Sequence, residues 1–92
     1  MPKIQSKARK RVLAAIEYLE DPGKENGTAA AFNRNYGALR ETLRNGSEAN
    51  RKLVESFMRR NFAPTVSSFR RNIAAGLMQA DTNIRLGSPA IE

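Results

Sequence analysis

The chain has 92 residues and carries 16 Lys and Arg against 9 Asp and Glu, which gives a formal net charge of +7. Apolar residues make up 40% and charged residues 27%, so the chain can bury a modest core and is not wholly disordered. There is no Cys and no His, which excludes disulfides, thiolate metal sites and the commonest general base. The length suits one small domain, and we expect an all-α fold because no run of alternating β-branched residues predicts a strand.

The first half of the chain predicts three helices. Apolar residues recur at helical spacing over residues 6–20, and Asp21-Pro22-Gly23 ends this first helix. A short, Ala-rich second helix follows over residues 28–32, with a threonine as its N-cap. A turn at residues 33–36 then leads into a third helix, which ends before Gly46 because glycine is common just past a helix end.

The second half predicts two more helices and a tail. Ser47 is the predicted N-cap of a fourth helix over residues 48–60, and Thr65 that of a fifth helix after a proline turn. We therefore expect a single helical domain over residues 1–80 and an irregular tail over residues 81–92. Helices four and five form a predicted hairpin on a three-helix head, and because so small a core leaves them short of partners we expect a homodimer through them.

Positive charge is concentrated at the start of the chain. Residues 1–11 contain five Lys and Arg and no acid, whereas residues 12–26 contain four acids and one Lys. Cations near a helix N-terminus oppose the helix dipole at a cost of a few tenths of a kcal/mol, so something other than helix stability favours them. Cations grouped within two turns release counterions from nucleic acid, which predicts a phosphate-binding segment. Its residues within the first helix are Lys7, Arg9, Lys10 and Arg11. A merely solubilising start to the chain is the structural alternative.

Residues 28–46 have the layout of a helix-turn-helix, in which the second helix enters the DNA major groove. Arg40 is the predicted base reader, because arginine donates two hydrogen bonds to guanine, and Asn35 is the second candidate. Arg34 and Arg44 are expected to neutralise phosphates. The alternative is an ordinary helical hairpin whose arginines form its solvated face.

The segment from Tyr36 to Arg44, Tyr-Gly-Ala-Leu-Arg-Glu-Thr-Leu-Arg, resembles the second half of a pipsqueak-type or related homeodomain-like helix-turn-helix. That family pattern contains Tyr-Gly followed by Thr-Leu-Arg, and Ala30-Ala31 match the paired alanines before its Tyr-Gly. The spacing between the alanines and the tyrosine is longer here, and Leu39 stands where a proline is common. The resemblance implies a DNA-binding protein of the regulatory kind.

Four further arginines flank the proline turn between helices four and five. Arg59-Arg60 end one helix and Arg70-Arg71 lie in the next, so the predicted hairpin brings the pairs together as a secondary basic patch. A structural role is the alternative for Arg59 and Arg60, because cations at a helix C-terminus complement its dipole.

No pattern predicts catalysis, a metal or a cofactor. Glu17 and Asp21 share a helix face but have no polar partners, the serines have no histidine to activate them, and no phosphate-binding glycine loop follows a strand. No segment approaches the roughly 20 apolar residues of a membrane span, so we expect no membrane partner and a cytoplasmic or nucleoid-associated protein.

The expected function is DNA binding in transcription regulation. Two alternatives remain. The first is a small phage- or plasmid-type interaction or inhibitor protein that binds an acidic protein surface or a nucleoprotein complex. The second is RNA binding through the basic N-terminal helix.

Overall fold

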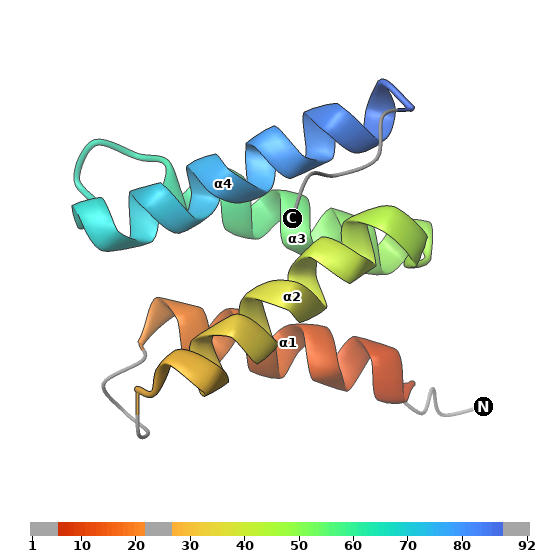
Figure 1. The fold of residues 1–92 in the computed structure, drawn as a ribbon, viewed down its shortest axis with the longest axis horizontal. Coiled ribbons are helices and arrows are strands. Elements are labelled where there is room, and N and C mark those ends of the chain that lie inside the picture. The colour runs from red at the N-terminus through yellow and green to blue at the C-terminus, as the bar shows by residue number, and fades with distance from the viewer. Residues whose placement is uncertain (1–5, 22–26, 88–92) are drawn as a thin grey trace.

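A computed structural model describes residues 6–21 and 27–87 of the chain. These residues form four α-helices and no strand, so the all-α class is confirmed, while the predicted number of five helices is wrong. The helices are α1 (Lys7–Glu20), α2 (Ala29–Asn45), α3 (Glu48–Asn61) and α4 (Ser68–Arg85). Lys3 of the basic segment and the end of the predicted tail lie outside the described residues. Figure 1 shows α2 running between α1 on one side and α4 on the other, with α3 behind it.

Each helix begins at a hydroxyl N-cap, which satisfies one backbone N–H that the first turn leaves without a partner. The side-chain oxygen accepts from the N–H three residues on, at 3.0–3.3 Å in all four helices. The predicted caps Thr28 and Ser47 are confirmed. The last helix is capped by Ser67 instead of the predicted Thr65, because a tight turn precedes it, in which the N–H of Val66 donates to the carbonyl of Ala63 at 3.0 Å.

The predicted turn at residues 33–36 is wrong, because α2 continues through it. Asparagine disrupts a helix when its amide bonds outside the helix. Here the amide of Asn35 donates to the carbonyl of Ala31 at 2.7 Å, one turn back. The rings of Phe32 and Tyr36, also one turn apart, stack with 5.8 Å between centroids. The three-helix head is therefore two helices, the second of 17 residues.

The predicted tail begins too early, because residues 81–85 belong to α4. Arg85 Nε donates to Asp81 Oδ2 at 2.9 Å, and Arg85 Nη2 pairs with Glu55 Oε2 at 2.9 Å on α3. Both contacts hold the last turn against the bundle. The chain leaves the helix at Gly87, whose φ of 77° is readily adopted only by glycine.

The core lies where the four helices meet, and α3 packs against each of the others. The largest fully buried apolar side chains come from all four helices: Leu19, Leu39, Leu43, Val54, Phe57 and Leu77. One turn of two residues, Gly46 and Ser47, joins α2 to α3. The start of α3 therefore lies beside the end of α2.

Candidate nucleic-acid interface

The start of α1 presents the predicted phosphate-binding cations. Val12, Ile16 and their neighbours on that stripe are buried, which directs the remaining faces of the helix outward. Three of the cations, Lys7, Lys10 and Arg11, are exposed, and Arg9 is half-buried. None of the four forms an ion pair with an acid in the described part of the chain. The first turn of α1 also contains no acidic residue. The N-terminal half of α1 is therefore a concentrated source of positive potential.

The predicted base readers lie in the middle of a helix rather than at its start. Because residues 28–46 include no turn, the helix-turn-helix geometry predicted for them is wrong. The side chain of Asn35 is held within α2 by its bond to the helix backbone. The guanidinium of Arg40 lies over the ring of Tyr36, 5.6 Å from its centroid, in cation–π geometry. Arg34 and Arg44 are exposed on α2, where they can contact phosphates.

An aromatic cluster, formed by Phe32, Tyr36 and Phe69, lies at the seam between α2 and α4. The rings of Phe32 and Phe69 are 6.1 Å apart, and Phe69 stays 47% exposed. The hydroxyl of Tyr36 lies against Gly76, where any Cβ would collide with it. Burial raises the pKa of Tyr36 above 10.0, and the nearby charge of Arg40 opposes that rise. The sequence pattern did not predict the cluster. In an unbroken helix, the four-residue spacing of Phe32, Tyr36 and Arg40 would indicate the contacts within α2, but not the contact with Phe69.

The surface of the described residues includes two grooves of similar size. The first, the α1–α3 groove, has a volume of about 590 Å³ and lies between the starts of α1 and α3 and the second half of α2. Its lining includes the cations Lys7 and Arg11. The second, the α3–α4 groove, has a volume of about 660 Å³ and is lined by apolar side chains such as Met58, Phe62 and Met78.

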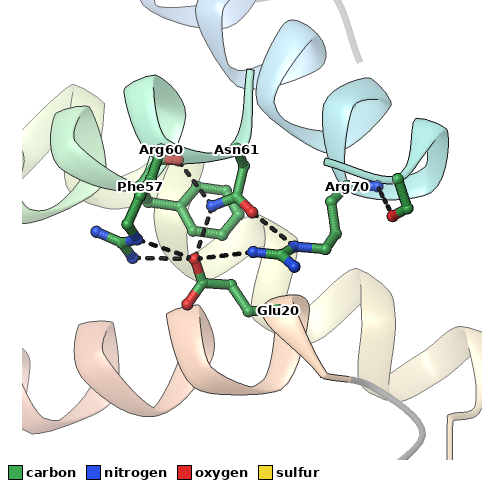
Figure 2. Close-up of polar contacts among 6 residues, drawn as sticks. Glu20, Phe57, Arg60, Asn61 and Arg70 are labelled. Atoms are coloured by element: carbon green, nitrogen blue, oxygen red, sulfur yellow. Dashed lines mark hydrogen bonds and ion pairs between the residues drawn. The ribbon is translucent and has the colours of Figure 1, made fainter. Parts of the chain in front are cut away.

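The secondary basic patch is organised around an acid. Figure 2 shows Arg60 and Arg70 converging on the carboxylate of Glu20 at the end of α1. Glu20 Oε2 accepts from Arg60 at 3.0 Å and from the Asn61 amide at 2.7 Å, and it lies 3.7 Å from Arg70 Nη2. Asn61 is fully buried; its amide also donates to the carbonyl of Phe57, and its oxygen accepts from Arg70 Nε at 2.7 Å. This set of side chains, the Glu20 cluster, ties α1, α3 and α4 together.

The other two members of the patch stand apart from this cluster. Arg59 is exposed and donates to the hydroxyl of Ser56 at 3.3 Å. Arg71 is half-buried, and its Nε has no hydrogen-bond partner among the described residues. Of the four arginines of the predicted patch, the structure brings Arg60 and Arg70 together at Glu20, which partly neutralises their charge.

Comparison with protein-family models, with curated proteins and with solved structures found no match for this chain. Within the described residues, no group of three or more acidic side chains lies close enough to hold a metal ion. None of the four helices is both long and apolar enough to cross a lipid bilayer. A functional assignment therefore rests on the chain's own surface chemistry.

Proposed function

We propose that the protein binds nucleic acid, with DNA as the expected ligand, across the face formed by α1 and α2. The observation that carries this proposal is the grouping of cations in the first two turns of α1, with no described acid paired to them. Cations that stabilise a fold are usually matched by acids, as Arg60 and Arg70 are here by Glu20. Unmatched cations close together suit a ligand of regularly spaced negative charges.

The phosphate backbone supplies most of the affinity in this mode of binding. Lys7, Lys10 and Arg11 contact phosphates from α1, while Arg34 and Arg44 contact them from α2. Because phosphate contacts carry no sequence information and no recognition helix begins near Asn35, affinity depends weakly on sequence. The exposed ring of Phe69 offers a stacking surface for an unpaired base.

The test is fluorescence anisotropy of labelled duplex DNA, single-stranded DNA and RNA across a salt series, with heparin as an unrelated polyanion. In the double variant Lys7→Gln/Lys10→Gln, we expect the slope of log affinity against log salt to fall by about 1.8 on duplex DNA, because each phosphate that a cation neutralises contributes about 0.9 to that slope. The control is Lys52→Gln, which removes an exposed cation that already pairs with Glu48 on α3. This control should leave the slope unchanged.

Two outcomes would overturn the proposal. One is binding to heparin as tight as to every nucleic acid, which would indicate charge attraction alone. The other is an equal effect of the double variant and the Lys52→Gln control. A strong dependence of the Arg40→Ala effect on DNA sequence would instead restore base reading by Arg40, at about 1–3 kcal/mol for a preferred site.

A second candidate function is self-association. The homodimer expected from the sequence uses helices four and five, which correspond to α3 and α4 in the structure. The α3–α4 groove leaves Phe62 51% and Met78 40% exposed, and its rim carries both signs of charge. A second copy of the chain suits such a surface, since a two-fold interface must complement itself. Light scattering should show a dimer that Met78→Glu converts to a monomer; a wild-type monomer at high concentration would reject this candidate.

A further inference from the structure

We propose that the seam between α2 and α4 binds an unpaired nucleotide of a single-stranded nucleic acid, with its base stacked on the ring of Phe69. This inference deepens the proposed function and rests on it for the remainder of the strand. The seam consists of the aromatic cluster and the residues that flank it on both helices. Figure 1 shows α2 between α1 and α4, so a strand bound by the α1 cations crosses α2 to reach the seam.

The ring of Phe69 is held in place but left half open. Its centroid lies 6.1 Å from that of Phe32, with the ring planes tilted by 55°, and Phe32 in turn stacks on Tyr36. Phe69 nevertheless stays 47% exposed. Phe62 and Met78, which are exposed to a similar degree, line the α3–α4 groove instead. A ring that its neighbours already fix loses little freedom on binding, which suits a surface for base stacking.

Gly76 shows how closely the two helices fit at this seam. It lies inside α4, where glycine is less favourable than alanine. A Cβ at this position would collide with the hydroxyl of Tyr36, so the close approach of α2 to α4 requires the glycine. The same approach accompanies the ring contact between Phe32 and Phe69. The seam is therefore a fixed surface on two helices, as a preorganised binding site requires.

Positive charge lies beside the rings. The guanidinium of Arg40 lies over the ring of Tyr36, and its charge opposes the rise in the pKa of Tyr36 that burial causes. The helices α2 and α4 contain one acid each, and both acids line other parts of the surface: Glu41 the α1–α3 groove and Asp81 the α3–α4 groove. A phosphate attached to a base at the seam therefore meets a cation and neither carboxylate of these two helices.

Amide side chains continue the seam along α4, on the helix face that contains Gly76. Counted from that glycine, Asn72, Gln79 and Asn83 lie four residues before, three after and seven after, which are the spacings of one helix face. Asn72 and Gln79 are exposed, and the amide of Gln79 donates to the oxygen of Asn83 at 3.3 Å. Amides donate and accept hydrogen bonds, so they suit the edges of an unpaired base and do not repel its phosphate.

Stacking on Phe69 requires a base with an open face. Bases inside a duplex are covered by their neighbours, whereas a single strand can turn a base out onto an aromatic ring. The seam therefore predicts a preference for unpaired strands. Because every base has a π-face, this preference depends weakly on sequence. DNA and RNA strands both carry such bases, so the inference concerns the unpaired state and not the sugar.

The test compares the affinity of the full chain for a short oligodeoxythymidine and for an abasic strand with the same number of phosphates, by fluorescence anisotropy. We expect the wild type to bind the strand with bases at least about five-fold more tightly. The variant Phe69→Leu, which stays apolar but has no ring, should remove most of this difference and leave the affinity for the abasic strand unchanged. The matched control is Phe62→Leu, which removes a ring of similar exposure from the α3–α4 groove and should change neither affinity.

A second variant detects the stack directly. The chain contains no Trp, so Phe69→Trp introduces a single indole, whose fluorescence is quenched when a base stacks on it. We expect quenching by oligodeoxythymidine and, at higher concentration, by deoxythymidine monophosphate, but none by the abasic strand. In the control Phe62→Trp, none of the three ligands should quench the indole.

The outcomes separate this inference from the proposed function. Equal wild-type affinity for the strands with and without bases would overturn the stacking site and leave nucleic-acid binding through phosphates standing. Equal effects of the variants at Phe69 and Phe62 would do the same. Quenching of Phe69→Trp by the mononucleotide, without affinity of the wild type for any strand, would support the site and overturn the proposed function. Because the comparison of the two strands uses the wild-type chain, it decides the question even if a variant fails to fold.

Discussion

Removal of the carboxylate at the centre of the Glu20 cluster should lower the free energy of unfolding, chiefly through the hydrogen bond that Asn61 loses. In Glu20→Ala, Asn61 keeps its bond to the carbonyl of Phe57 and its bond from Arg70, but one N–H of its fully buried amide is left without an acceptor. An unsatisfied buried donor costs about 1–3 kcal/mol. The pair with Arg60, half-exposed in water, adds less than about 1 kcal/mol. We therefore expect a loss of about 2 kcal/mol.

The amide variant Glu20→Gln separates the hydrogen bond from the charge. It retains an oxygen that can accept from Asn61, so the expected loss is about 1 kcal/mol, half that of the alanine variant. The control is Glu17→Ala, one turn earlier on α1, which is exposed and has no ion pair in the described structure. Both acids oppose the dipole at the end of α1, so removal of either gives the same small gain of a few tenths of a kcal/mol. Only Glu20 also takes part in the cluster.

Urea denaturation followed by circular dichroism measures these differences, and the melting temperature should fall by about 4–8 °C for each kcal/mol in a domain of this size. If the free energies of unfolding of Glu20→Ala and Glu17→Ala differ by less than about 0.5 kcal/mol, water replaces the carboxylate and the Glu20 cluster contributes nothing to stability. Equal losses in the alanine and glutamine variants would show that charge, and not the Asn61 bond, dominates.

Three further predictions concern close backbone contacts and the aromatic cluster. Gly46→Ala should cost about 1–3 kcal/mol in urea denaturation, because its Cβ would lie 2.5 Å from the carbonyl oxygen of Thr42; an unchanged midpoint would contradict the tight turn. Gly76→Ala should destabilise the fold by displacing the Tyr36 hydroxyl, and a double variant with Tyr36→Phe should recover most of that stability, whereas additive effects would contradict the contact. In Tyr18→Phe, absorbance should show the remaining phenol of Tyr36 ionising above pH 10.0. Because the pKa of Tyr36 is raised in the folded state, its contribution to the free energy of unfolding should be constant below about pH 10 and fall above it. This fall should be smaller in Tyr36→Phe.

The sequence predicted those helix N-termini at which a side-chain hydroxyl caps the backbone. Thr28 and Ser47 are recognisable because a hydroxyl before a helical stretch has one obvious local use. Asn35 shows the limit of such signals. Its amide can end a helix or bond one turn back within it, and the packing of Phe32 on Phe69, far along the chain, supports the second arrangement.

Long-range polar contacts were not predictable from spacing. Arg85 holds the last turn of α4 through Glu55, 30 residues away, so the local Asn and Gly content wrongly predicted a tail. The Glu20 cluster joins residues 40 or more positions apart. The exposure of the α1 cations, in contrast, was predictable, because unpaired charges are costly to bury.

These contacts divide the cations of the chain into two groups with different roles. In the described structure, Lys52, Arg60, Arg70 and Arg85 on α3 and α4 pair with acids, whereas none of the grouped cations in the first two turns of α1 does. Removal of a cation from the Glu20 cluster should therefore lower stability and leave the affinity of the folded protein for nucleic acid nearly unchanged. Removal of Lys7 or Lys10 should lower affinity and raise stability slightly, because it relieves the opposition to the helix dipole. If the two groups affected both properties alike, the positive charge would be a property of the whole surface and the binding face would have no distinct location.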